Sequence, residues 1–323
     1  MAKKSPASTP DILRKLRQLE RKYAAMGQDM ASYLEGLLQA DYLTYWDYVH
    51  LETLLSLQTP RTAYPDELIF ITYHQTTELY FKLVLHELHQ IADHPNLFAE
   101  FFVERMQRVN RYFEILEKSF AVMTHGMEKE QFLKFRMALL PSSGFQSVQF
   151  RQIEIVSTAF DHLLASDETD GLPHPDAPLA DRYEYLYWKR GATELATHQK
   201  TLTLRQFDKR YSRQLIDLAT AVADTNLWQC LQRMRATHQL LDELVTVLRE
   251  YDWRVNVRWK LAHLRTAVEY LQKEPEDIRA TGGTNWQTYL PPRQQQTIFF
   301  PELWSDTERQ AWGGPFFQIS QEK

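Results

Sequence analysis

Cysteine and glycine are scarce in this chain of 323 residues, and their scarcity limits the kinds of protein it can be. Cys230 is the single cysteine, which excludes an internal disulfide and a cysteine-rich zinc or iron–sulfur site and favours a reducing compartment. Glycine occurs only 10 times, which favours long helices with few tight turns. No run of the sequence approaches the roughly 20 apolar residues that a membrane span needs. These absences together predict a helical protein that does not cross a membrane.

Strongly basic stretches are also missing, since the net charge is −5 and the sequence pI is near 6.1. This charge balance argues against nucleic acid as a partner. The first residues, MAKKSPASTPD, carry two lysines but no apolar stretch behind them, unlike a secretory signal. We therefore expect a soluble, cytoplasmic protein with neither a nucleic-acid partner nor a membrane partner.

Aromatic residues are abundant, at 13% of a chain whose hydrophobic and charged fractions, 44% and 24%, are ordinary for a globular protein. A chain of this length can bury a core that needs no disulfide or metal to stabilise it. Phenylalanine, tyrosine and tryptophan are large core residues, and they also line pockets that bind aromatic ligands. Composition alone leaves both roles open.

Helical periodicity dominates the chain. Apolar residues recur three and four positions apart from Ile12 to Tyr23, after a start signal in Thr9-Pro10-Asp11. Similar periodicity predicts further helices at roughly 41–58, 66–93, 96–124, 128–140, 145–166, 182–198, 204–222, 224–250 and 254–273. No segment shows the period of two that is typical of a strand. The predicted fold class is all-α, a multi-helix bundle.

The chain is predicted to form one domain over residues 1–323. The polar segment SDETDGLPHPDAPLAD, residues 166–181, contains three prolines and four aspartates, so we expect a surface loop there. A second irregular segment, 275–293, contains the Gly-Gly pair of ATGGTNW. The final residues, 305–323, are polar and interrupted by glycine and proline, and we expect a loosely held tail.

The 11 histidines raise two metal-site hypotheses. A ferritin-like di-iron site needs a glutamate three residues before a histidine on each of two helices, and no histidine here has one. The string HELH at 86–89 resembles a shortened zinc-protease motif, but its two histidines are three residues apart rather than four. We therefore expect His86 and His89 to lie on a polar helix face.

Three polar residues stand among apolar neighbours and are candidates for chemistry. His74, in FITYHQTTELYFKLVLHEL, lies one helical turn after Phe70 and is either a core histidine or part of a site. Arg136, in FLKFRMALLPSSGF, is a fixed cation that needs an anion, which is either an internal carboxylate or that of a ligand. His263, in WKLAHLRTAVEYL, follows Trp259 by one turn and is either structural or a ligand. The residues themselves leave each alternative open.

The order of these motifs along the chain resembles the tryptophan 2,3-dioxygenase family of haem enzymes. DYLTYWDYVHLETLLSLQTP is similar to the family's early tyrosine-bearing helix, and FITYHQTTELYFKLVLHEL is similar to its distal-pocket helix. FRMALLPSSGFQSVQFRQIE resembles its arginine and serine signature, and WKLAHLRTAVEYL resembles the helix that carries the haem ligand. ATGGT followed by IFFPELW resembles its Gly-rich closing loop. The resemblance covers roughly residues 40–305, and HQTTEL and PSSGFQSVQFR are its most specific strings.

The resemblance implies a helical fold around a haem b pocket. His263 would be the proximal ligand of the iron, and Ser143 would lie in the turn that lines the haem. His74 would lie on the oxygen-binding side, within hydrogen-bond reach of the substrate's indole N–H. Arg136 would bind the substrate carboxylate, so His74 and Arg136 are the implied catalytic residues.

Five further residues are implied to bind the substrate. Phe70 would pack on the indole ring, Phe132 would lie near it, and Thr281 would help hold the amino-acid end. Tyr45 and Tyr48 belong to a helix that, in the family, is lent to the pocket of a neighbouring subunit. The resemblance therefore implies a homotetramer.

The implied reaction inserts both atoms of O₂ across the indole C2–C3 bond of L-tryptophan, giving N-formylkynurenine in tryptophan catabolism (the kynurenine pathway). The oxygen would bind at the open position of the haem iron, and much of the catalysis would be positioning of the substrate. One alternative is an oxygenase of the same superfamily that acts on another aromatic amino acid or a substituted indole. A non-catalytic haem-binding sensor is the alternative from another class, although a sensor would not need Arg136 beside the distal histidine.

Four features near the implied substrate depart from the family pattern. The chain from His263 to Thr281 is about four residues longer, or about one helical turn. Phe132 stands where a tyrosine is expected, Val49 replaces a leucine, and Ala280 replaces the first glycine of the loop. The departures concern the substrate side of the implied site, so they bear on which aromatic compound it accepts.

Overall fold

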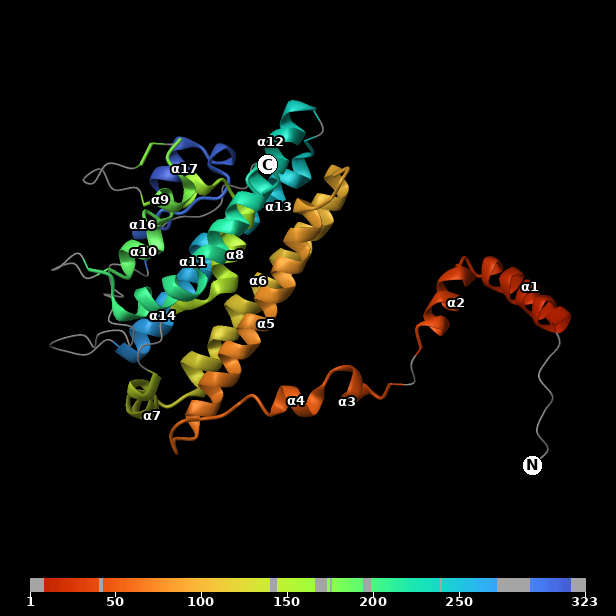
Figure 1. Cartoon of the computed structure of the whole chain (residues 1–323), viewed down its shortest axis with the longest axis horizontal. Coiled ribbons are helices and arrows are strands. Elements are labelled where there is room, and N and C mark those ends of the chain that lie inside the picture. Colours follow the sequence, from red (N-terminus) through yellow and green to blue (C-terminus); the bar gives the residue numbers. More distant parts are fainter. Residues whose placement is uncertain are drawn as a thin grey trace. The chain divides into compact units, whose positions relative to one another are not determined.

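The computed structural model describes residues 9–40, 43–139, 144–165, 173–174, 176–193, 199–238, 240–271 and 291–314. Helices make up the regular structure of these residues (Figure 1), and the β contacts among them are limited to isolated bridges, Leu164–Leu186 and Thr193–Lys200. The predicted all-α class is confirmed. None of the helices in this described part is long and apolar enough to cross a membrane.

The chain divides into two compact units, Met1–Gln58 and Thr59–Lys323. The first unit contains α1 (Thr9–Ala25), α2 (Met30–Leu38), α3 (Tyr45–Tyr48) and α4 (Leu51–Leu55). No residue of these four helices is buried, and large apolar side chains such as Leu37 and Leu38 are exposed. Exposed apolar side chains on this scale mark an interaction surface. The single domain over residues 1–323 stays a prediction.

The second unit is built on two long antiparallel helices, α5 (Asp66–Ala92) and α6 (Ala99–Gly126), which run side by side (Figure 1). Its other α-helices are α7 (Lys129–Phe135), α8 (Val148–Ser157), α9 (Leu179–Tyr183), α10 (Tyr187–Gly191), α11 (Leu202–Ala221), α12 (Leu227–Ala236), α13 (Asp242–Trp253), α14 (Lys260–Leu271), α16 (Pro292–Gln295) and α17 (Asp306–Gln310). Short helical segments of other types are η1 (Arg136–Leu139), η2 (Gly144–Gln146), η3 (Phe160–Leu163), η4 (Arg254–Trp259) and η5 (Pro301–Leu303).

The core of the second unit lies where α6 packs along α5 and α13, and where α8 packs against α5 and α11. Its fully buried members recur at helical spacing, with Val84 and Leu88 on α5 and Phe102, Met106 and Phe113 on α6. Burying each such side chain contributes about 1.5–3 kcal/mol. This packing holds α5 and α6 in a fixed relation, and both helices carry residues of the site described below.

Two long predicted helices are interrupted at histidines. The predicted helix 41–58 is broken at His50, which has a φ of 50°, and the predicted helix 224–250 is broken at His238, with a φ of 55°. Both angles lie in the left-handed region, which ends an α-helix and which histidine adopts more readily than most residues. The unbroken helices predicted at these two places are therefore wrong.

The predicted helix 182–198 is also wrong, because two short helices, α9 and α10, replace its first part. The chain between them is extended at Leu186, which forms the isolated bridge with Leu164. The N–H of Ala165 donates to the carbonyl of Tyr185 at 2.9 Å. These pairings with a distant segment use backbone groups that a continuous helix would bond internally. The predicted loop 166–181 also ends early, since α9 already begins at Leu179.

The segment after α14 is anchored by one buried carboxylate. Asp252 accepts the backbone N–H groups of Phe299 and Phe300 at 2.9 and 3.1 Å and the indole N–H of Trp304 at 3.0 Å. Burial raises the pKa of Asp252 to about 6, while these donors act in the opposite direction. The IFFPELW string is thereby attached to α13.

The expectation of a loose tail from residue 305 is wrong for its first part. Ser305 caps α17 through a capping box with Glu308, and Arg249 on α13 pairs with Glu308 at 2.7 Å. Trp312 is buried, and its indole N–H donates to the carbonyl of Thr297 at 3.0 Å. The capping box, the Arg249–Glu308 ion pair and the buried Trp312 therefore attach residues 305–314 despite their polar composition. Residues 315–323 of the predicted tail lie outside the described residues.

Candidate functional site

Helix α5 presents Phe70 and His74 together, one turn apart, as their spacing predicts. Their ring centroids are 4.1 Å apart, and Nδ1 of His74 lies 2.7 Å from the carbonyl oxygen of Phe70. Because a carbonyl oxygen only accepts, Nδ1 donates this hydrogen bond, and Nε2 is the nitrogen left as an acceptor. Part of the His74 residue is accessible to water. The protein atoms around its ring nevertheless displace enough water to lower its pKa below the usual value. His74 is therefore mostly neutral at pH 7, and its Nε2 has no hydrogen-bond partner among the residues that the structure describes.

His263 lies on α14 and is the second imidazole of the site. Burial, together with a smaller electrostatic effect of His74, lowers its pKa to about 4. Within the described part of the chain, neither ring nitrogen of His263 has a hydrogen-bond partner. The two histidines, far apart in the sequence, are thus close enough to influence each other electrostatically, and His263 is neutral at pH 7.

Two neighbours restrict the His263 ring. The ring of Phe120 on α6 lies 6.1 Å from it with an interplanar angle of 21°. Gly144 is the other neighbour, since a Cβ added there would lie 3.3 Å from Cε1 of His263, tighter than nine in ten real contacts of this kind. Glycine at position 144 therefore leaves the room that the imidazole occupies.

Aromatic side chains form a wall beside Phe70. The Phe70 ring lies 6.1 Å from Phe132 and 5.8 Å from Phe135, and Phe132 lies 4.8 Å from Tyr270 on α14. Phe135, Tyr270 and neighbouring residues form a small apolar cluster separate from the main core. Aromatic rings at these distances suit a planar aromatic ligand.

Arg136 follows this wall directly, as the first residue of η1 after Phe135. Its side chain is buried, as only 6% of the residue is exposed, and burial lowers the pKa of the guanidinium. The group nevertheless stays charged at every physiological pH. Arg136 is thus a buried cation next in sequence to Phe135, whose ring contacts those of Phe70 and Phe132, and its role in binding stays a prediction.

The described structure does not place four other predicted site residues relative to this region. Tyr45 and Tyr48 lie on α3 in the first unit, and both are largely exposed, at 72% and 74%. Ser143 and Thr281 lie outside the described residues. The roles of all four stay predictions.

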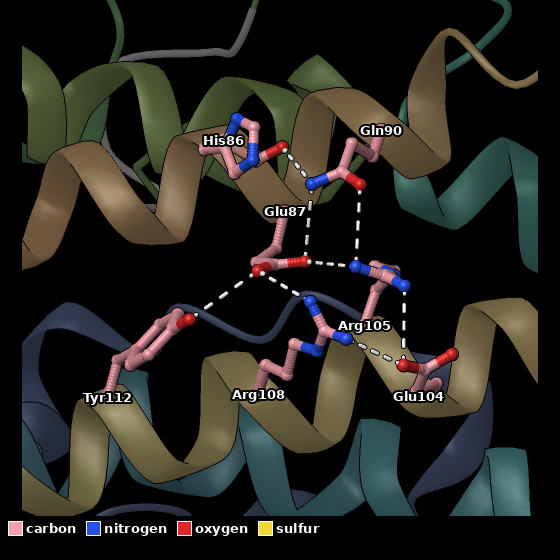
Figure 2. Close-up of polar contacts among 7 residues, drawn as sticks. All are labelled: His86, Glu87, Gln90, Glu104, Arg105, Arg108 and Tyr112. Carbon is pink, nitrogen blue, oxygen red and sulfur yellow. Dashed lines mark hydrogen bonds and ion pairs between the residues drawn. The ribbon is translucent and has the colours of Figure 1, made fainter. Parts of the chain in front are cut away.

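The HELH string has a structural explanation on α5. His86 is exposed, whereas Glu87 is buried and its carboxylate lies between Arg105 at 3.2 Å and Arg108 at 3.6 Å on α6. Figure 2 shows this arrangement, with Tyr112 also donating to the carboxylate. The glutamate is thus occupied by ion pairs that join α5 to α6, which agrees with a helix-packing role for this string.

Sequence reasoning missed the residues that hold His263. Phe120 belongs to RYFEILEKSFAVM, which reads as an ordinary amphipathic helix, and Gly144 was noticed only as part of the PSSGF string. Phe135 and Tyr270, which belong to the aromatic wall, also look like ordinary core residues in the sequence. The one signal that could have indicated them is adjacency, since Gly144 and Phe135 flank the predicted Arg136–Ser143 signature.

The fold and the site define an all-helical protein in which two neighbouring neutral imidazoles, one exposed and one half-buried, lie near an aromatic wall and a buried arginine. A family model described as "Tryptophan 2,3-dioxygenase" matches residues 35–159, the part of the chain that contains Phe70, His74 and Arg136. Because a relative with this name is also 32% identical over 82% of the chain, the chain belongs to the tryptophan 2,3-dioxygenase family.

Relatives of this chain extend the match beyond the family model. A tryptophan 2,3-dioxygenase of a Ruegeria species is 32% identical over 82% of this chain and 92% of its own length. Those of Bradyrhizobium diazoefficiens and Pseudomonas fluorescens are 30% and 28% identical, over 81% and 82% of this chain and 91% and 90% of their own lengths. A match over 82% of this chain is long enough to include His263 on α14.

Proposed function

We propose that this protein is a haem-dependent dioxygenase that inserts O₂ across the indole C2–C3 bond of L-tryptophan to give N-formylkynurenine. The observation that supports it best is the pair of neutral imidazoles, His74 on α5 and His263 on α14, in electrostatic contact beside an aromatic wall. One imidazole is available to bind iron, and the other is available to accept a proton or a hydrogen bond.

The residues present fit a haem group. His263 is neutral, and its ring nitrogens are free of hydrogen bonds within the described residues, which is the state that a metal ligand needs. The Phe120 ring is an apolar neighbour of His263, and the absence of a side chain at Gly144 leaves room beside the imidazole. We assign His263 as the proximal ligand and Ser143 to the turn beside the haem. When bound, the haem supplies an iron site at which O₂ can be activated.

The protein's own residues bind and orient the substrate. Phe70 and Phe132 provide the aromatic wall against which an indole packs. Nε2 of His74 accepts a hydrogen bond from the indole N–H, because Nδ1 is already engaged with the Phe70 carbonyl. Arg136 binds the substrate carboxylate with two parallel hydrogen bonds, and Thr281 holds the amino-acid end. Catalysis by these residues is positioning of the indole C2–C3 bond.

We expect His74→Ala to retain haem and to convert L-tryptophan about 10²–10⁴-fold more slowly, the range for one positioned proton-handling group. The reason is that His74 orients the substrate without ligating the iron. Absorbance spectra of the purified variant and steady-state turnover measure the two effects. His89→Ala is the control, since His89 lies on the same helix and pairs only weakly with Asp93 at 3.9 Å. Loss of haem from His74→Ala would instead assign it as an axial ligand.

We further propose that the active form is a cytoplasmic homotetramer, in which Tyr45 and Tyr48 of one subunit complete the pocket of another. The first unit buries none of its own helical residues, and both tyrosines project largely into solvent. A covering surface on a second copy of the chain accounts for this exposure.

The shared site predicts the behaviour of a truncated protein. Removal of residues 1–50 should abolish turnover, and light scattering of the full-length protein should give the mass of a tetramer. Tyr45→Ala with Tyr48→Ala should keep the tetramer if the apolar leucines of α2 carry the interface, while the Michaelis constant for tryptophan rises. A full-length protein that is monomeric and fully active would refute the shared site.

A further inference from the structure

Helices α13 and α14 form one continuous helix from Asp242 to Leu271, and its middle six residues, η4, are π-helical. A π turn closes its hydrogen bonds one residue later than an α turn, and such turns are rare and frequent at functional sites. Each residue of an α-helix advances about 100°. One extra residue in the turn therefore rotates all of α14 by about that angle relative to an unbroken α-helix. His263 follows η4 by less than two turns, so its direction depends on η4.

One face of α6 packs along this segment. Phe113, Glu117 and Phe120 recur four and three positions apart, which places them on the same side of the helix. The Phe113 and Phe120 rings lie 6.4 and 4.7 Å from Trp259, the last residue of η4. Phe120 also stacks near His263, so α6 contacts both the end of the π turn and the imidazole beyond it.

Between these two phenylalanines, the Glu117 carboxylate bridges both ends of the π turn. Its oxygens lie 3.1 Å from Arg254, the first residue of η4, and 2.7 Å from Arg258. The Glu117 side chain is only 6% exposed, and that of Arg254 only 12%. Arg254 also pairs with Glu250 on α13 at 2.8 Å. We call Glu117, Arg254 and Arg258 the Glu117 cluster.

We propose that Glu117 is a positioning residue that, through Arg254 and Arg258, holds η4 in its π-helical form and so sets the rotation of α14 that turns His263 toward the site. The inference rests on the proposed role of His263 as the haem ligand. A carboxylate that pairs with residues at both ends of the turn opposes its conversion to an α turn, because that conversion would move Arg258 relative to Arg254. Partners that orient a metal ligand typically change metal affinity or activity by 10–100-fold when removed.

The test compares two buried glutamates with the same chemistry. Glu117→Gln removes the charge of the Glu117 cluster, and Glu87→Gln removes the charge of the α5–α6 pair, where the carboxylate also lies between two arginines (Figure 2). Both are made in the full-length protein, and both are expected to lower the melting temperature. Haem loss to excess apomyoglobin should be about 10–100-fold faster in Glu117→Gln and unchanged in Glu87→Gln. Backbone hydrogen exchange over residues 254–264 should rise only in Glu117→Gln.

A second, milder variant tests the same inference if Glu117→Gln fails to fold. Arg258 is 45% exposed, so Arg258→Gln is expected to fold and to change haem loss and exchange in the same direction, by less. Equal acceleration of haem loss in Glu117→Gln and Glu87→Gln would overturn the inference, since general stability would then explain both. Faster exchange at η4 with unchanged haem loss would overturn it while leaving the haem assignment intact. A wild-type protein that takes up no haem would refute the proposed function itself, and the role of Glu117 with it.

Discussion

His263→Ala is expected to give a folded protein that no longer retains haem. The His263 ring makes no hydrogen bond within the described residues and is only partly buried, so its removal costs the fold little beyond its packing on Phe120. It is, however, the assigned proximal ligand, and even indirect partners of a metal change affinity by about 10–100-fold. The loss of haem affinity should exceed that range. Soret absorbance per chain and far-ultraviolet circular dichroism, measured on the same sample, separate haem loss from unfolding.

A matched control makes this result specific. His86 lies exposed on α5, more than three helical turns after His74, so His86→Ala should bind haem as the wild type does. If His263→Ala keeps the wild-type Soret spectrum, another residue ligates the iron and the assignment of α14 fails.

Arg136→Leu and Arg136→Lys are both expected to retain haem and to bind L-tryptophan more weakly by roughly 2–5 kcal/mol. Arg136 is a buried, permanently charged guanidinium that follows the aromatic wall, and a planar guanidinium matches a carboxylate with two hydrogen bonds. Lysine cannot reproduce that paired geometry, so the conservative change should not rescue binding. Tryptophan titrations followed by the haem spectrum measure the affinities. Lys134→Leu, two residues earlier on α7, is the control for loss of a positive charge.

The decarboxylated analogue tryptamine tests the same contact from the ligand's side. Tryptamine should bind the wild type poorly and should distinguish little between wild type and Arg136→Leu. If tryptamine binds the wild type as well as tryptophan does, Arg136 serves an internal ion pair. A substrate without a carboxylate, such as a substituted indole, would then replace L-tryptophan in the proposed reaction.

Helical periodicity predicted the fold class and the location of most helices, because amphipathic spacing is a local property of the sequence. The breaks at His50 and His238 were not predictable, since histidine is not a strong helix breaker and adopts the left-handed conformation only somewhat more readily than most residues. The π turn at η4 was also not predictable from the sequence. One extra residue in a turn leaves the apolar pattern almost unchanged, and the ion pairs that accompany it come from another helix.

The candidate site was predictable where a polar residue contrasts with its neighbours. His74, Arg136 and His263 each stand in an apolar run, and the structure places them near one aromatic cluster. Glu117 gave no such contrast, because in EILEKSF it looks like an acid on a solvated helix face. Its function depends on the tertiary contact with Arg254 and Arg258, which no local pattern contains.

The visible spectrum of the dithionite-reduced protein, with and without L-tryptophan, tests the central claim most directly. The two neutral imidazoles and the adjacent aromatic wall predict a Soret band typical of histidine-ligated haem, and they predict that L-tryptophan perturbs this band because it binds beside the iron. A purified protein that shows no Soret band and gains none when haem is added would contradict the account.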